Sequence, residues 1–126
     1  MLILIDIDNL DISNIYLGDR VINKIADMKW FQRLGYSTPD YDLSGVYIYV
    51  PVKSYLYKSR MEQLIKLERD ILGSINTNHL TPTFSIYETL RYKSIFVQGI
   101  THILVKISGI WETSDKYGLI FKIRYY

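Results

Sequence analysis

The chain has no cysteine, no long apolar run and no basic N-terminal region, and each absence excludes a class of protein. Without cysteine there is no disulfide framework and no thiolate metal site, which fits a reducing compartment. The apolar start of the chain, Met1–Ile5, is far too short to span a membrane. Asp6 and Asp8 follow it at once, so it does not resemble a secretory signal peptide. We therefore expect an intracellular protein without a membrane partner.

The sequence also lacks the motifs of common catalytic sites. It has no Gly-rich phosphate loop and no paired glutamates at a spacing suited to acid–base catalysis. Its two histidines, His79 and His102, have no neighbouring nucleophile or carboxylate pair. Asp6 and Asp8 could share one side of a strand and bind a divalent cation, but an Asp-rich turn is the commoner interpretation. We predict no enzymatic activity, no cofactor, no metal and no small-molecule substrate.

The chain does contain enough apolar material for one folded domain. Its 126 residues are 48% hydrophobic and 22% charged, and no repeat or Gly/Ser linker divides residues 1–126. The net charge is +2, but residues 1–19 hold four of the 13 acidic residues and none of the 15 basic ones. The remainder therefore has a net charge of +6. This distribution fits either a polyanion-binding body with an acidic segment that competes for it, or a chance excess of surface aspartates.

Two C-terminal runs show the clearest strand pattern. Apolar residues alternate with other residues over Ile103–Trp111 and again over Tyr117–Tyr126, so each run predicts a half-buried strand. Lys106 points away from the aliphatic face of the first run, and Lys122 and Arg124 do the same in the second. The outward faces carry cations and no carboxylate.

The rest of the chain predicts further strands, one helix and a loop, with patterns that are less regular than those of the two C-terminal runs. Residues 15–26 fit either a strand or a short helix, and residues 6–14 indicate a turn or loop. Over residues 55–75 apolar side chains recur at intervals of three and four, which predicts an amphipathic helix of about five turns. We expect its apolar face, which includes Leu64, to be buried. Strand composition is found at residues 1–8, 29–36, 41–52, 83–89 and 94–100.

This order of elements predicts a mainly β fold with some helix. Strands precede and follow a single central helix, and the alternating helices of a parallel βαβ architecture are missing. The layout matches a small OB-like Greek-key barrel, with the amphipathic helix between the third and fourth of five strands. An α+β sandwich, with the helix packed on one antiparallel sheet, is the alternative.

Four of the predicted strands present aromatic or cationic side chains opposite an aliphatic face. Cations suit phosphates and aromatic rings suit unpaired bases, so this pairing is typical of a sheet that binds single strands. Period-two alternation does not decide whether Trp30 or Phe31 lies in the core, and we expect Trp111 to be a core residue. The candidate nucleic-acid-binding residues are Lys29, Phe31, Arg33, Tyr47, Tyr49, Lys106, Lys122, Arg124 and Tyr126.

Two blocks of the sequence resemble a known family. They cover about a third of the chain and are Trp30–Pro39 with Tyr41–Ile48, and Lys106–Thr113 with Tyr117–Lys122. They are similar to blocks in small OB-fold, single-stranded-DNA-binding proteins of eukaryotic DNA viruses and related mobile elements. The acidic C-terminal tail that is typical of bacterial single-strand binders is missing here.

The resemblance implies a non-enzymatic role in viral-type DNA replication. We expect a protein that binds single-stranded DNA with little sequence preference, forms a homo-oligomer in some settings, and acts in the host nucleus or a cytoplasmic virus factory. Two other functions fit the same residues. One is a structural or assembly protein whose Tyr-rich face is a protein–protein interface, and the other is an RNA-binding regulator.

Overall fold

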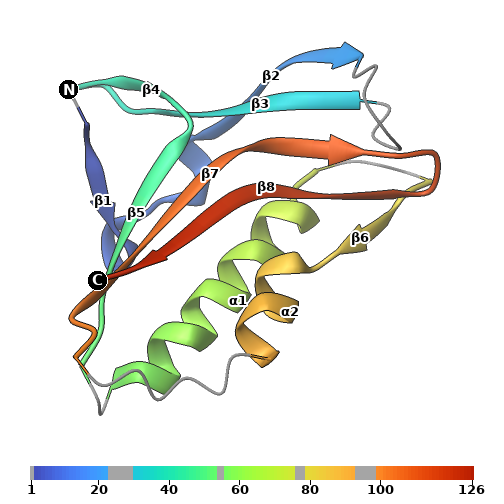
Figure 1. The fold of residues 1–126 in the computed structure, drawn as a ribbon. Coiled ribbons are helices and arrows are strands. Elements are labelled where there is room, and N and C mark those ends of the chain that lie inside the picture. The colour runs from blue at the N-terminus through green and yellow to red at the C-terminus, as the bar shows by residue number, and fades with distance from the viewer. Residues whose placement is uncertain (1, 23–29, 54–55, 76–78, 93–98) are drawn as a thin grey trace.

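The computed structural model describes residues 2–22, 30–53, 56–75, 79–92 and 99–126. Eight strands in these ranges join one mixed sheet, with two α-helices packed against it (Figure 1). The strands are β1 (Leu4–Asp6), β2 (Ile15–Ile22), β3 (Trp30–Ser37), β4 (Asp42–Ser44), β5 (Val46–Pro51), β6 (Thr81–Thr83), β7 (His102–Glu112) and β8 (Lys116–Tyr125). The helices are α1 (Tyr57–Gly73) and α2 (Ser85–Tyr92), and two 3₁₀ turns, η1 (Ile7–Asn9) and η2 (Ile12–Asn14), follow β1.

The long strand β7 organises the sheet. It pairs with β8 along one side, and along the other side with β5 over its first half and with β3 over its second half. β1 extends the β5 arm in parallel, whereas β2 and β4 flank β3 on its two sides. The two arms separate at Gly45, whose φ of 81° lies in the left-handed region that favours glycine. The splayed arms are visible in Figure 1 as β1–β5 and β2–β3.

One face of the sheet forms the hydrophobic core with α1. The helix buries an apolar stripe that includes Leu64 and Ile71, which are 0% and 1% exposed. Aliphatic side chains of β5 and β7 meet this stripe, and the Tyr117 hydroxyl donates a 2.9 Å hydrogen bond to the carbonyl of Leu72. The predicted helix over residues 55–75 is thus confirmed, along with the burial of its apolar face. No helix in the described ranges is long and apolar enough to cross a membrane.

The mainly β fold class is confirmed, but the closed barrel is wrong. The sheet stays open, because β1 and β2 lie at separate ends of the strand order and do not pair with each other. The helix covers the sheet as a layer and does not plug the end of a barrel. This arrangement is closer to the sandwich alternative, although the pairs β1–β5 and β6–β8 are parallel. Neither parallel pair was predicted.

The predicted strand at residues 83–89 is also wrong, because Thr83 ends β6 and residues 85–89 belong to α2. Ile86 and Leu90, one helical turn apart, are both buried. The buried Glu68 carboxylate of α1 accepts hydrogen bonds from the Ile86 and Tyr87 backbone N–H groups, at 2.8 and 3.1 Å. It therefore caps the start of α2 from another helix, a stabilising contact that local sequence patterns do not reveal.

Other predicted elements agree with the structure or lie outside it. Residues 15–26 were ambiguous, and the described part of that range is the strand β2. The predicted strand 41–52 is divided at Gly45 into β4 and β5. The predicted strand at 94–100 falls largely on residues 93–98, which lie outside the described residues.

Candidate nucleic-acid interface

The face of the sheet that points away from α1 and α2, called here the outer face, carries the candidate residues. In β5, Val46, Ile48 and Val50 are at most 1% exposed, whereas Tyr47 and Tyr49 between them are half-buried. The alternation predicted for this strand is confirmed. Because strand pairing keeps directly opposite residues on one face, the register from β5 through β7 to β8 defines the rest of the outer face.

Three cations gather on this face without an acidic partner. Lys106 of β7 lies directly opposite Lys122 of β8, and Arg124 is the next outward residue along β8. The Lys106 ammonium lies 5.2 Å from the centre of the Tyr47 ring, within the range of a cation–π contact. None of the ion pairs formed by the described residues includes these three cations. Like charges directly opposite each other destabilise a sheet, so an anion at this position would be favoured.

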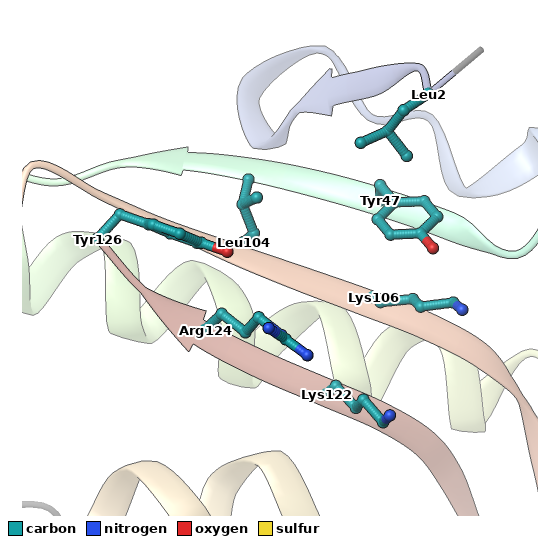
Figure 2. Close-up of a pocket in the computed structure, with 7 residues that line it drawn as sticks. All are labelled: Leu2, Tyr47, Leu104, Lys106, Lys122, Arg124 and Tyr126. Carbon is teal, nitrogen blue, oxygen red and sulfur yellow. The ribbon is translucent and has the colours of Figure 1, made fainter.

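The three cations line one shallow hollow of about 310 Å³, called the first hollow. Figure 2 shows them projecting from β7 and β8 beside the Tyr47 ring, with Leu2 above that ring. The hollow therefore combines cations, aromatic rings and aliphatic side chains on an open surface. Its lining consists of Leu2, Tyr47, Leu104, Lys106, Lys122, Arg124 and Tyr126.

An aromatic stack borders the first hollow. The centres of the His102 and Tyr126 rings are 5.1 Å apart with an angle of 7° between their planes, and the Tyr49 ring lies 5.3 Å from His102 at a tilt of 32°. Tyr126 is 50% exposed, so a face or an edge of its ring is accessible to a ligand. His102 was not among the predicted site residues. The alternation His102, Leu104, Lys106 along β7 was the signal that could have identified it.

A second hollow, of about 240 Å³, adjoins the first where the two arms of the sheet separate. The exposed Arg33 and the half-buried Phe31 belong to it, and Lys106 lines both hollows. Its lining consists of Phe31, Arg33, Ser44, Gly45, Lys106 and Ser108.

A bulge in β7 places Trp111 on the outer face, which corrects its predicted position in the core. The register of β7 against β8 shifts between Ile107 and Gly109, so that alternation restarts one residue later. Ile110 then points to the core and is 0% exposed, while Trp111 lies half-buried above Gly118. A regular strand would have buried Trp111 instead.

Eight of the nine predicted binding residues thus lie on one face. The first hollow brings together Tyr47, Lys106, Lys122, Arg124 and Tyr126, the second contains Phe31 and Arg33, and Tyr49 belongs to the stack. Lys29 lies outside the described residues. The expectation that either Trp30 or Phe31 lies in the core is wrong, because both rings are half-buried and neither belongs to the hydrophobic core. The Arg20 guanidinium lies 4.6 Å from the centre of the Trp30 ring.

The aspartates of the acidic N-terminal segment do not line either hollow, and three of them accept hydrogen bonds within the fold. Asp8 accepts hydrogen bonds from Gln63 and Arg60, which lower the pKa of its carboxyl group. A hydrogen bond from Ser13 likewise lowers the pKa of Asp11, which caps η2. Asp6 caps η1 by accepting a bond from the Asp8 backbone N–H. These contacts indicate a structural role for the segment.

The buried carboxyl groups of the described residues take part in contacts within the fold. No cluster of three or more metal-ligating side chains is found among them. The one fully buried carboxyl group in these ranges, Glu68, is occupied in capping α2, and burial raises its pKa despite the hydrogen bonds that it accepts. No family model matches the chain, and no curated protein or solved structure is significantly similar to it.

Proposed function

We propose that the outer face binds single-stranded DNA with little sequence preference, in support of viral-type replication. The observation that carries the proposal is the cluster of Lys106, Lys122 and Arg124 in one hollow beside aromatic rings. Backbone phosphates would neutralise these like charges, and unpaired bases would stack on the rings. The resemblance of the two sequence blocks to viral single-strand binders supports the same proposal. In that role the protein would act where the viral DNA is copied, in the host nucleus or a cytoplasmic virus factory.

The shape of the outer face favours single strands over duplex DNA. Duplex DNA is read by an element inserted into a groove, such as a helix or a two-stranded ribbon. Here the described helices cover the opposite face, and the cations and rings lie within a shallow sheet surface. The rings are accessible to bases only if the bases are unpaired. Stacking on them depends weakly on base identity, which accounts for the low sequence preference.

A titration of labelled oligonucleotides tests this function. Oligo-dT, oligo-rU and duplex DNA are compared by fluorescence anisotropy at two salt concentrations, with Tyr47→Ala as the binding variant. We expect oligo-dT to bind more tightly than duplex, and Tyr47→Ala to cost about 1–3 kcal/mol of binding free energy with little loss of folding stability. Tighter binding of oligo-rU would assign the site to RNA. An affinity that does not change with salt would contradict the phosphate contacts.

A protein–protein interface remains the second candidate. Exposed apolar residues lie at both ends of the sheet, with Leu2 and Leu4 at 59% and 43% exposed and Val21 and Ile22 at 53% and 61%. Such residues are typical of contact surfaces between proteins. Size-exclusion chromatography with light scattering, done with and without oligo-dT, separates the two functions. Self-association without DNA and no oligonucleotide binding would favour the interface.

A further inference from the structure

The two hollows of the outer face form one strip that follows β7. Lys106, midway along this 11-residue strand, lines both of them. The β7 residues that line the hollows reach from Leu104 to Ser108, which is roughly 13 Å at about 3.3 Å per residue, so the strip is longer than one nucleotide.

Cations are found at successive levels along this strip. Arg124 lies opposite Leu104, Lys122 opposite Lys106, and Arg33 opposite Gly109. Lys116 continues the series near the far end, where it is exposed and follows the outward alternation of β8. A phosphate backbone that runs along β7 would therefore meet a cation at each level. A phosphate backbone that crosses the β-strands at a single position along β7 would meet fewer cations.

The second half of the strip also has an aromatic floor. A Cβ on Gly109 would lie 2.9 Å from a Phe31 ring atom, and one on Gly118 would lie 2.7–2.9 Å from three atoms of the Trp111 indole. Both rings therefore lie across the neighbouring strand, in space that other residues would fill with a side chain. This arrangement leaves low relief on the outer face and rings on which bases can stack.

We propose that a single strand binds along β7 in two subsites, one in each hollow, with Lys106 contacting the phosphate between them. This inference rests on the proposed function. It goes beyond that function by stating the path of the DNA strand over the protein and which residues bind it in each subsite. The first subsite uses Tyr47, Lys122 and Arg124. The second uses Arg33 and Phe31 of the second hollow, and Trp111, which the β7 bulge turns outward, lies beyond that hollow on the same face.

A length series of oligo-dT tests the two subsites. Anisotropy titrations use oligonucleotides from about 4 to about 16 nucleotides, the range occupied by single-strand-binding folds. The shortest oligonucleotides fill only one subsite, so Arg33→Ala should bind them as the unmodified protein does. Longer oligonucleotides reach the second subsite, and Arg33→Ala should then lose affinity and show a log–log salt slope that is shallower by about 0.7. Lys106→Ala should weaken binding at every length.

Arg69→Ala is the matched control, because Arg69 is an exposed arginine on α1, away from the outer face. It should leave binding unchanged at every length, and thermal melting of each variant verifies that it is folded. Equal losses for Arg33→Ala at all lengths would overturn the two-subsite inference while leaving the proposed function intact. A complete lack of oligo-dT binding by the unmodified protein would instead overturn the proposed function.

Discussion

Replacement of Lys122 by alanine should weaken DNA binding without destabilising the fold. Lys122 is exposed and lies directly opposite Lys106, and neither forms an ion pair with a described residue. Cross-strand pairs contribute roughly 0.2–1 kcal/mol, and like charges carry the unfavourable sign. Lys122→Ala should therefore leave the free energy of unfolding unchanged or raise it by up to about 1 kcal/mol.

The same substitution removes one phosphate contact. On single strands each contact contributes about −0.7 to the log–log dependence of affinity on salt, so Lys122→Ala should make that slope shallower by this amount. Between about 50 and 200 mM salt, each contact accounts for a loss of affinity of roughly 2.6-fold. The affinity of Lys122→Ala should thus fall less steeply with salt than that of the unmodified protein.

Urea unfolding and anisotropy titration with oligo-dT at several salt concentrations measure the two effects. Lys66→Ala is the control, because Lys66 is exposed on α1 and forms a 3.0 Å ion pair with Asp70. It should leave binding unchanged and should not stabilise the protein. If Lys122→Ala destabilised the fold and left the salt slope unchanged, the cation cluster would be a structural feature and the anion-site argument would be refuted.

Three further predictions address the fold itself. Leu64→Ala should lower the free energy of unfolding by about 2–5 kcal/mol in urea titrations, because the side chain is 0% exposed under the sheet. Burial raises the pKa of Glu68, so its contribution to stability is full at acid pH and is lost as pH rises through that pKa. In thermal melts from pH 4 to pH 7, the difference in melting temperature by which the unmodified protein exceeds Glu68→Gln should therefore become smaller as pH rises. Gly109→Ala should lower the free energy of unfolding by roughly 1–3 kcal/mol, since the alanine Cβ would lie close to the Gln32 carbonyl oxygen. A change in the pairing register of β3 with β7 should be detectable in backbone NMR spectra.

Local sequence patterns predicted those helices and strands in which the spacing of apolar residues matches the face that is buried. The alternation in β5, in β8 and in β7 as far as Ile107, together with the helical spacing in α1, predicted these elements and the faces that they bury. They succeeded because each element buries one face only, and a half-buried element leaves its period in the sequence.

Tertiary contacts decided the elements that were predicted wrongly. Most of the predicted strand at residues 83–89 belongs to α2, whose start is capped by Glu68, 18 positions before Ile86. The sheet stays open because β1 pairs with β5 and β2 pairs with β3, so that β1 and β2 lie at opposite ends of the strand order. Such contacts join residues far apart in the sequence, and no short window of the chain records them.

The candidate site shows the same division. The sequence by itself placed cations and rings on the outward faces of separate strands, because period two fixes which side chains share a face. Only the tertiary structure aligned the strands, so that Lys106 lies opposite Lys122 and is shared by two hollows. The β7 bulge, which turns Trp111 outward, depends on pairing with β8 and was equally beyond local pattern. Long-range packing sets the register of the strands, and this register places these residues side by side on one surface.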